Sequence, residues 1–492
     1  MSAIRVAIRA SRLERPAWQA DLIARLRELP GVDVVETFEA RLLQPADLLI
    51  DPTEGALAPG GPLHPPLGVW RLIYGAEGRL TTPGLVEHAS GERGVMARLV
   101  SVDANGKASL LETGMFRTVA HSLSATRARM FGAIAEWPAR ALRRVLAAES
   151  ALERGGHVTI APWPQGAMPT PGQWPRGAIR NYGRRIAHEL VEEHWTLGVI
   201  RKPVAHVIDS FDANQIDWLT FPPGMVIADP AGALERGGRT TILAEAYDFE
   251  DRRGRIVAMA MENARIVSAP REVLRLPVHV SYPHLIAHAG QIYCLPEASA
   301  TRRVQLFRAD PFPDRWVPDR ILLNDFAGAD ATVYCYGGRW WMFTGNHEDQ
   351  DEAKLFLFHA DRLFGPWQPH PLNPVKCDLR SARPAGPLFE HKGSLYRPAQ
   401  DGSRTYGGAV AINRIVALSI TEFAEETINV LRPAPSGPCP DGLHTLLGVG
   451  DLTLVDGKRH ARSFKRLAWG LKQLARQRAR PRARNDGSTQ IR

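Results

Sequence analysis

The sequence predicts an α/β domain followed by an all-β domain, a five-bladed β-propeller, and two observations lead to this fold class. The first is a phrase of short apolar strands that recurs at an interval of about 50 residues, which is typical of propeller blades. One copy begins at residues 290–297 and ends at Trp316, and the next begins at residues 337–343 and ends at Trp367. The second is a β-α-β pattern at the N-terminus. A propeller directs its inner strands at one central pocket, so candidate functional residues are expected there.

Composition indicates a globular protein with more than one domain. The chain has 492 residues, of which 44% are hydrophobic and 23% charged. The N-terminus lacks a signal-peptide core, and no window approaches the roughly 20 apolar residues of a membrane-spanning helix, so we predict a cytoplasmic protein. The four cysteines lack C-x-x-C spacing, which argues against a zinc site and a disulfide framework. We expect all four to be reduced and buried.

The positive charge is confined to one end of the chain. The net charge is +9, but residues 458–492 hold twelve Lys or Arg and one Asp, a net +11, which leaves −2 for residues 1–457. Recognition of nucleic acid requires a basic face on a folded domain. This distribution therefore argues against nucleic acid as a partner.

Residues 1–148 are predicted to form the α/β domain. Hydrophobic periodicity predicts strands at 3–9, 32–35, 48–51, 68–75, 95–102 and 108–112, a turn at 103–106, and helices at 16–28 and 124–147. Residues 46–51, 82–84 and 114–118 resemble the formyltransferase fold, a Rossmann-type fold, in a branch related to methionyl-tRNA formyltransferase. That resemblance implies an Asn, a His and an Asp around the transferred carbon. His64 is the nearest match, but no suitable Asn or Asp accompanies it, so we expect no formyl transfer.

Residues 149–193 are predicted to be a Pro-rich linker and docking helix, because closely spaced prolines favour an extended spacer. The propeller is assigned to residues 194–460, with blades ending near residues 222, 274, 319, 371 and 431. Residues 442–460 are predicted to supply a strand that closes the first blade, before a turn at Asp456-Gly457. Residues 461–492 form a basic amphipathic tail.

Short phrases in the propeller resemble those of a known family. Residues 227–230, 243–245, 281–284, 295–299, 328–330, 383–386 and 396–401 follow the order found in bacterial relatives of the propeller domain of plant glucosamine inositolphosphorylceramide transferase. The blade pattern is also similar to five-bladed carbohydrate-active enzymes such as arabinofuranosidases and xylosidases. The resemblance implies a protein that handles a glycan or sugar conjugate. The separate glycosyltransferase domain of the plant enzyme has no counterpart in this sequence.

Four carboxyl groups are the candidate catalytic residues, since each follows an apolar strand and chemistry on a glycosidic bond uses a pair of carboxyls. They are Asp229, Glu245, Glu297 and Asp330. The alternative is that such residues accept hydrogen bonds from backbone amides at blade turns. The candidate substrate-binding residues are His284, Arg383, Arg397, Gln400, Tyr282 and Tyr406. The arginines suit a phosphate or carboxylate, or they neutralise the four carboxyls, and the tyrosines suit stacking on a sugar.

No metal site is assigned, because the charged run at 347–352 is interpreted as a solvated hairpin tip. The sequence lacks a phosphate-binding P-loop, H-E-x-x-H and G-x-S-x-G, which argues against a P-loop nucleotidase, a zinc protease and an ordinary serine hydrolase. No cofactor is predicted, although a nucleotide-sugar donor fits the resemblance.

The expected function is therefore a glycosyl-transferring or sugar-modifying enzyme in cell-surface polysaccharide or glycolipid assembly. The alternatives are a non-catalytic glycan-binding module and a glycoside hydrolase of the five-bladed type. Apolar residues from Phe464 to Ala475 recur at helical spacing among basic residues, which suits an anionic membrane surface at the inner face. The alternative for this tail is a helix packed on the propeller.

Overall fold

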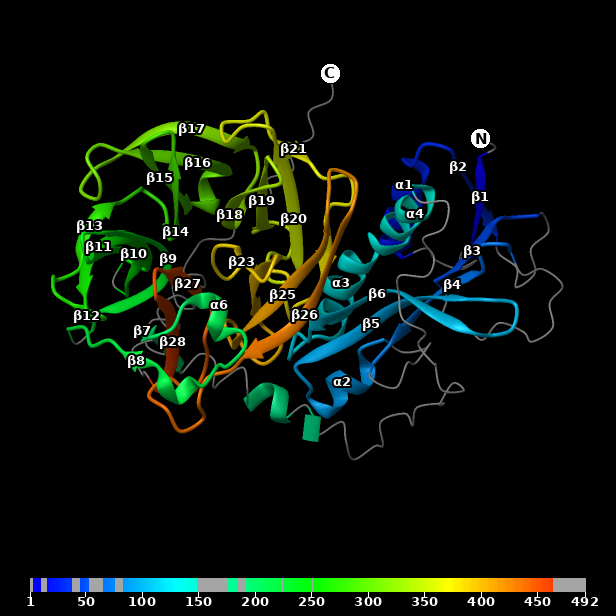
Figure 1. The fold of residues 1–492 in the computed structure, drawn as a ribbon. Coiled ribbons are helices and arrows are strands. Elements are labelled where there is room, and N and C mark those ends of the chain that lie inside the picture. Colours follow the sequence, from blue (N-terminus) through cyan, green and yellow to red (C-terminus); the bar gives the residue numbers. More distant parts are fainter. Residues whose placement is uncertain are drawn as a thin grey trace, which may run out of the picture.

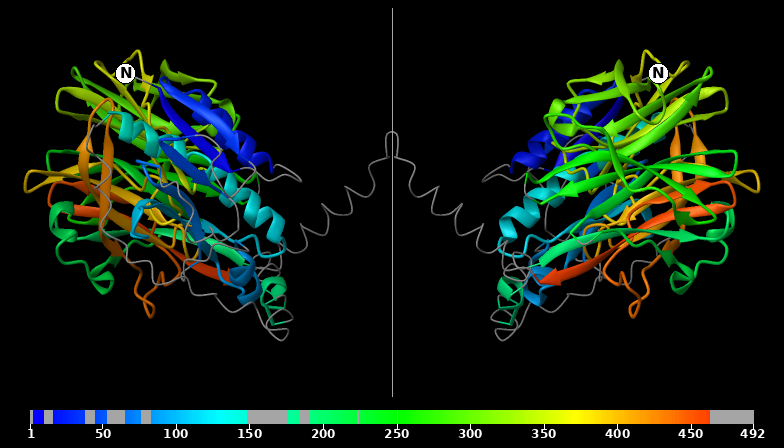
Figure 2. Two further views of the ribbon diagram at one scale, coloured as in Figure 1. Left: turned by 90° about the vertical axis from the view of Figure 1, so that its right-hand side faces the viewer. Right: turned by 90° about the vertical axis from the view of Figure 1, so that its left-hand side faces the viewer.

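The computed structural model describes residues 3–9, 16–37, 45–52, 65–75, 83–147, 176–177, 179–183, 191–222, 224–249 and 251–462. An α/β domain lies beside a ring of five β-sheets, and the two are in contact (Figures 1 and 2). Among these residues no helix is long and apolar enough to cross a membrane. His64 and the predicted amphipathic helix of the tail lie outside the described residues.

The N-terminal sheet has six strands in the order β2-β1-β3-β4-β5-β6. They are β1 (Ile4–Arg9), β2 (Val32–Thr37), β3 (Leu48–Asp51), β4 (Val69–Tyr74), β5 (Gly94–Val102) and β6 (Ala108–Arg117). The first four are parallel, and β5 and β6 join antiparallel. The predicted β-α-β opening is confirmed, with α1 (Ala17–Arg27) crossing from β1 to β2 and burying Leu22, Ile23 and Leu26. The short helix α2 (Leu85–Ser90) precedes β5.

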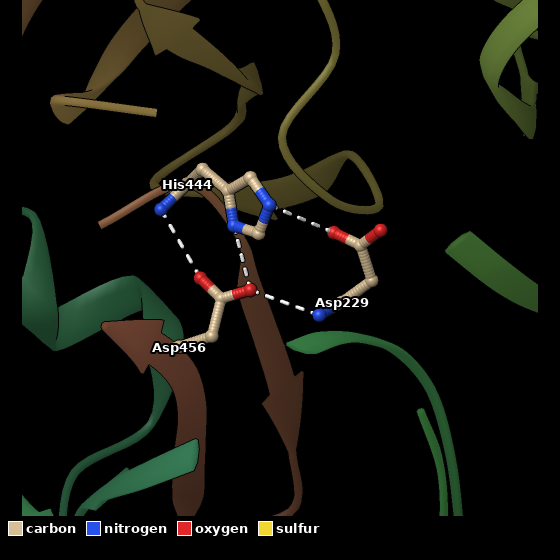
Figure 3. A group of neighbouring side chains, drawn as sticks. All are labelled: Asp229, His444 and Asp456. Atoms are coloured by element: carbon tan, nitrogen blue, oxygen red, sulfur yellow. Dashed lines mark hydrogen bonds and ion pairs between the residues drawn. The ribbon is translucent and has the colours of Figure 1, made fainter. Parts of the chain in front are cut away.

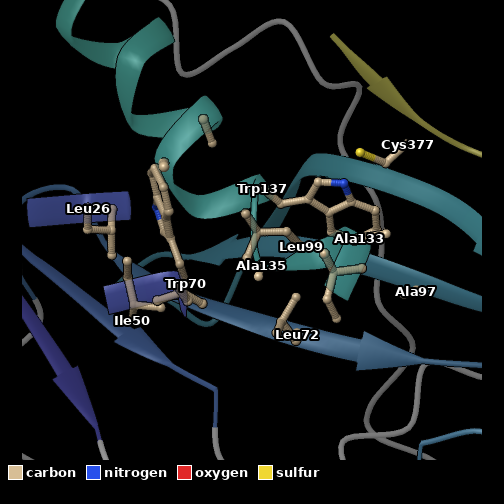
Figure 4. Packing of buried hydrophobic residues seen from close by; sticks show 14 of the residues in the cluster. Leu26, Ile50, Trp70, Leu72, Ala97, Leu99, Ala133, Ala135, Trp137 and Cys377 are labelled. Atoms are coloured by element: carbon tan, nitrogen blue, oxygen red, sulfur yellow. The ribbon is translucent and has the colours of Figure 1, made fainter. Parts of the chain in front are cut away.

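The prediction of one helix over residues 124–147 was wrong. The structure has two helices, α3 (Leu123–Ile134) and α4 (Trp137–Ala147). Pro138 explains the break, because its ring would clash with the carbonyl four residues earlier in a continuous helix, whereas proline is tolerated in a first turn. The new start also turns Trp137 into the domain core, where it is fully buried near Trp70 (Figure 4).

The five blades follow one another along the chain after residue 191, and the predicted five-bladed propeller is confirmed. One sheet contains β9 (Val226–Arg236), β10 (Arg239–Asp248), β11 (Arg253–Glu262), β12 (Arg265–Ile266) and β13 (Arg271–Leu274). The next contains β14 (Ser281–His288), β15 (Gln291–Glu297), β16 (Arg303–Ala309) and β17 (Trp316–Asn324). The third contains β18 (Gly328–Tyr336), β19 (Arg339–Asn346), β20 (Lys354–Ala360), β21 (Gln368–Pro369) and β22 (Lys376–Cys377). The fourth contains β23 (Phe389–His391), β24 (Ser394–Asp401), β25 (Ala409–Leu418) and β26 (Phe423–Leu431).

The remaining blade joins the two ends of the propeller segment. Its order is β27-β28-β7-β8, with β27 (Leu446–Val449), β28 (Leu452–Arg462), β7 (Val191–Ile200) and β8 (Asp217–Trp218). The predicted closing strand is confirmed, because β28 pairs with β7 from Thr453 to Arg462. The predicted turn at Asp456-Gly457 was wrong, since both residues lie inside β28. Two other blades continue past their predicted ends at residues 319 and 371, to Asn324 and Cys377.

The α/β domain packs on the propeller through β6 and the segment after β22. The amide of Leu379 donates to the carbonyl of Met115 over 2.9 Å, and Cys377 contributes to the same core as Trp137 (Figure 4). A Cβ atom on Gly114 would lie 2.1 Å from the carbonyl oxygen of Cys377, so this close approach requires glycine. All four cysteines are free, but the expectation that all are buried was wrong for Cys335, which is exposed.

Candidate functional site

The first part of the site is a bulge repeated near the start of three inner strands. The pairing register shifts in β9, β14 and β18, and the bulged residues Asp229, Tyr282 and Asp330 have φ of 50°, 44° and 50°. Side chains other than glycine rarely adopt this left-handed conformation, and Asp tolerates it better than most. Bulges of this kind redirect side chains and are common next to active sites.

A carboxylate at the end of the second strand supports the bulge of the next blade. Glu297 ends β15 and accepts a hydrogen bond from the amide of Asp330 at 3.0 Å. Asp456 in β28 accepts one from the amide of Asp229 at 2.9 Å. Glu297 and Asp456 therefore accept hydrogen bonds from backbone amides, which was the structural alternative for the candidate carboxyls. The side chains of Asp229 and Asp330 contact other polar side chains instead.

Arg383 connects three of these carboxyls. Its Nε donates to Asp330 at 2.5 Å, its Nη1 to Asp351 at 2.7 Å, and its Nη2 to Glu297 at 3.5 Å. Gln400 adds a hydrogen bond to the same Asp330 oxygen at 3.0 Å. Burial opposes the charge on Arg383, but Asp330 outweighs it and raises the pKa of the guanidinium further. Arg383 therefore stays positively charged.

Tyr406 lies over this guanidinium, with the Arg383 Cζ atom 5.5 Å from its ring centroid. Burial raises the pKa of the Tyr406 hydroxyl well above its usual range, although Arg383 opposes this. The ring is partly exposed, so it can serve as a side wall for a bound ligand.

His444 lies between the carboxylates of Asp229 and Asp456 (Figure 3). Its Nδ1 is 2.6 Å from Oδ2 of Asp456, and its Nε2 is 3.3 Å from Oδ1 of Asp229. Trp195 stacks on the imidazole with ring centroids 3.9 Å apart. Burial opposes protonation of His444, but Asp456 and Asp229 outweigh it and raise the pKa of the imidazole.

These three residues also offer a possible cation site, since one ligand atom from each lies within 4.8 Å of the others. The two carboxylates, however, lie on different ring nitrogens, and a metal ion occupies only one of them. A protonated imidazole satisfies both carboxylates at once. The geometry thus favours a proton over a metal ion at this position.

Three of the buried carboxyls have a raised pKa. Burial raises the pKa of Glu245 well above its usual range, and the charge of Asp229 adds to this. Burial and then the charge of Asp330 raise the pKa of Glu297 in the same way. Burial raises the pKa of Asp229 to about 6, with His444 opposing the rise. The site therefore combines two carboxyls, Glu245 and Glu297, whose pKa is raised well above the usual range with Asp229, whose pKa is about 6.

Three sequence-predicted residues do not present their side chains in the way the sequence predicted. Tyr282 is fully buried with its hydroxyl 2.7 Å from that of Thr332, so the expected stacking surface is absent. Arg397 does not join the axial carboxyls, because its guanidinium is committed to Glu425 at 2.6 and 2.9 Å. His284 lines a separate cavity of about 450 Å³ further along the inner strands, walled mainly by apolar side chains.

The sequence interpretation missed His444, Asp456 and Asp351. His444 follows a Pro- and Gly-rich stretch with no strand pattern, and Asp456-Gly457 has the composition of a turn. Asp351 lies in the acidic run that was interpreted as a solvated tip, yet it binds Arg383. One sequence signal could have located Asp456. The strand pattern that begins at Leu452 continues through Asp456, and a strand that continues through a residue leaves no turn there.

Comparison with known proteins relates the propeller to a plant family. Residues 253–435 match the family model described as the N-terminal part of glucosamine inositolphosphorylceramide transferase 1. The transferase 1 of Oryza sativa subsp. japonica is 35% identical over 157 residues, which are 31% of this chain and 21% of the relative. That of Arabidopsis thaliana is 31% identical over 152 residues, 30% of this chain and 20% of the relative. The predicted resemblance of the propeller is confirmed over this segment. The chain spans about a fifth of these relatives.

The matched segment contains Glu297, Asp330 and Arg383 but not Asp229, Glu245 or His444. Solved structures with weaker similarity include a family 117 glycoside hydrolase from Zobellia galactanivorans, with TM-score 0.36 and 15% identity over 55% of this chain and 91% of that chain. A GH43 protein from Bacillus licheniformis has TM-score 0.32 and 14% identity over 42% and 45%. These similarities are too low to bear on function.

Proposed function

We propose that the axial group binds the sugar part of a sugar conjugate and that the protein is a glycosyl-transferring or sugar-modifying enzyme of cell-surface polysaccharide or glycolipid assembly. The observation that carries this proposal is the group of buried carboxyls around Arg383 and His444, in which burial raises the pKa of Asp229, Glu245 and Glu297. Reaction at an anomeric carbon needs a proton donor on one side and an ionised carboxylate on the other. The match to the plant transferases supports the same class of substrate.

The residues divide into two roles. Glu245 is the candidate acid, because burial and the charge of Asp229 raise its pKa, and burial lowers the pKa of its neighbour His279, 3.5 Å away, which disfavours a positive charge there. Asp229 is the candidate base, since it titrates near pH 6 and adjoins the charged His444. Arg383 and Gln400 hold Asp330 in place and are positioning residues.

A thermal-shift screen against nucleotide sugars and surface-glycan fragments tests the proposal, followed by turnover of any hit. Asp229→Asn and Glu245→Gln should each reduce turnover by about 10²–10⁴-fold, the usual contribution of a general acid or base. Glu262→Gln is the control, because Glu262 is exposed and pairs only with Arg239 on an outer strand. Equal turnover by all three variants would contradict the assignment.

The alternatives make different predictions for the same variants. A glycan-binding module would bind its ligand without turnover, and Asp229→Asn would change only affinity. A glycoside hydrolase would release free sugar to water in place of transfer to an acceptor. Analysis of the products therefore separates the three possibilities.

The two flanking regions enter the proposal with lesser roles. The α/β domain is proposed to be a formyltransferase-like fold that has no formyl-transfer activity, so assays with a formyl-tetrahydrofolate donor should show only background. The tail is proposed to attach a cytoplasmic protein to an anionic membrane face. Deletion of residues 461–492 should abolish binding to anionic vesicles and leave ligand binding by the propeller intact.

A further inference from the structure

A group of arginines lies where the α/β domain contacts the loop that carries Tyr406. This loop, residues 402–408, joins β24 to β25. Arg117 at the end of β6 donates to the carbonyl of Gly402 at 3.2 Å, and Arg93 just before β5 donates to the carbonyl of Arg404. Two residues later, Tyr406 lies against Arg383. The arginines therefore contact, at the junction between the domains, the loop that holds Tyr406 beside Arg383.

The charges at this junction are poorly compensated. Arg117 pairs with Glu352 at 2.7 Å. Arg93 and Arg404 form no ion pair with an acidic side chain within the described ranges, and both are exposed. Burial lowers the pKa of Arg93, and the charges of Arg404 and Arg117 lower it further. The charges of Arg404 and Arg117 thus act on Arg93, and among the described ion pairs of these three residues a carboxylate is paired with Arg117.

A group of exposed positive charges attracts anions. A guanidinium presents a planar set of N–H donors that matches a phosphate or carboxylate, and several of them favour the doubly charged phosphate. We propose that Arg93, Arg117 and Arg404 form a binding site for a phosphoryl group. This phosphoryl group belongs to the same conjugate whose sugar enters the axial site. That assignment of the ligand rests on the proposed function.

The test measures binding of inorganic phosphate to the full chain by ³¹P line broadening or calorimetry. Arg404→Gln is the first variant, because its side chain is exposed and the carbonyl that accepts from Arg93 is kept. It should weaken phosphate binding about tenfold, as expected for loss of one charge-assisted contact. Arg93→Gln combined with Arg404→Gln should abolish it.

The basic tail also attracts phosphate, so the control must match the change in net charge. Arg201→Gln combined with Arg239→Gln removes two exposed charges on other blades, which pair with Asp217 and Glu262. This control should bind phosphate as the wild type does. Equal weakening in the control and the junction variant would overturn the proposal and leave non-specific attraction. Phosphate binding requires no turnover, so failure of the glycan screen alone would leave this site standing.

Discussion

Two arginines in identical Arg-Pro-Ala tripeptides have different surroundings. Arg397 is fully buried and forms, with Lys376 and Glu425, a cluster of two cations and one carboxylate, here called the structural cluster. Arg383 lies in the axial group, where it and His444 face five carboxyls: Asp229, Glu297, Asp330, Asp351 and Asp456. Glu245 adds a sixth.

The balance of charge decides how the carboxyls behave. Burial alone would raise the pKa of Glu425, but Arg397 and Lys376 outweigh it and lower the pKa to about 2. In the axial group burial and neighbouring carboxyls act together, so the pKa of Glu245 and Glu297 rises. In the structural cluster the cations keep the carboxylate ionised, and the three groups hold one another in place. In the axial group the carboxyls outnumber the cations, so they can exchange protons or bind a ligand.

The largest expected difference is in stability. Glu425→Gln leaves the buried Arg397 and the partly buried Lys376 without this carboxylate and should lower the free energy of unfolding by about 3–5 kcal/mol. Glu297→Gln replaces a carboxyl of raised pKa by a neutral amide of similar shape and should cost far less. Urea unfolding of both variants at neutral pH provides the measurement. Equal losses would show that the two clusters do not differ in this way.

The second difference is in the dependence of stability on pH. The depressed pKa of Glu425 contributes stability that is complete above its usual pKa and is lost as pH falls toward about 2. The raised pKa of Asp229 contributes stability that is complete below its usual pKa and is lost as pH rises through about 6. Glu425→Gln should therefore flatten the acid limb of the profile.

Asp229→Asn should flatten the limb between about pH 4 and 6. Unfolding in urea across both limbs measures the two effects in one series. A variant that flattens the opposite limb would contradict the assignment.

A smaller effect tests one hydrogen bond of the axial group. Thr445 donates to Oδ1 of Asp229 at 3.0 Å, which lowers the pKa of Asp229. Thr445→Val should raise that pKa and cost about 0.5–1.5 kcal/mol. Thr453→Val is the control, because buried Thr453 donates to the carbonyl of Lys202 at 2.8 Å and touches no carboxyl. Both variants should lose similar stability, but only the first should move the pH midpoint of Asp229 in a ¹³C carboxyl titration.

The sequence predicted the propeller because each blade repeats its own local pattern of strands and turns. It also predicted the closing strand. It singled out Asp229 and Asp330 but was wrong to place them at the ends of apolar strands, since they lie near the starts of β9 and β18. It did not distinguish the role of Arg383 from that of Arg397. The two tripeptides are identical, and the partners of the two arginines come from distant parts of the chain. It missed the contact of Asp456 with Asp229 because these residues are 227 positions apart and meet only when the ring closes.

The most direct test of the account is whether the axial carboxyls hold protons at neutral pH. Infrared difference spectra of the wild type should show the carbonyl stretch of protonated carboxyl groups at pH 7. The band should weaken in Glu245→Gln and in Glu297→Gln and remain unchanged in Glu425→Gln, whose carboxylate is ionised in the wild type. Absence of the band in the wild type at pH 7, or its loss in Glu425→Gln alone, would contradict the account.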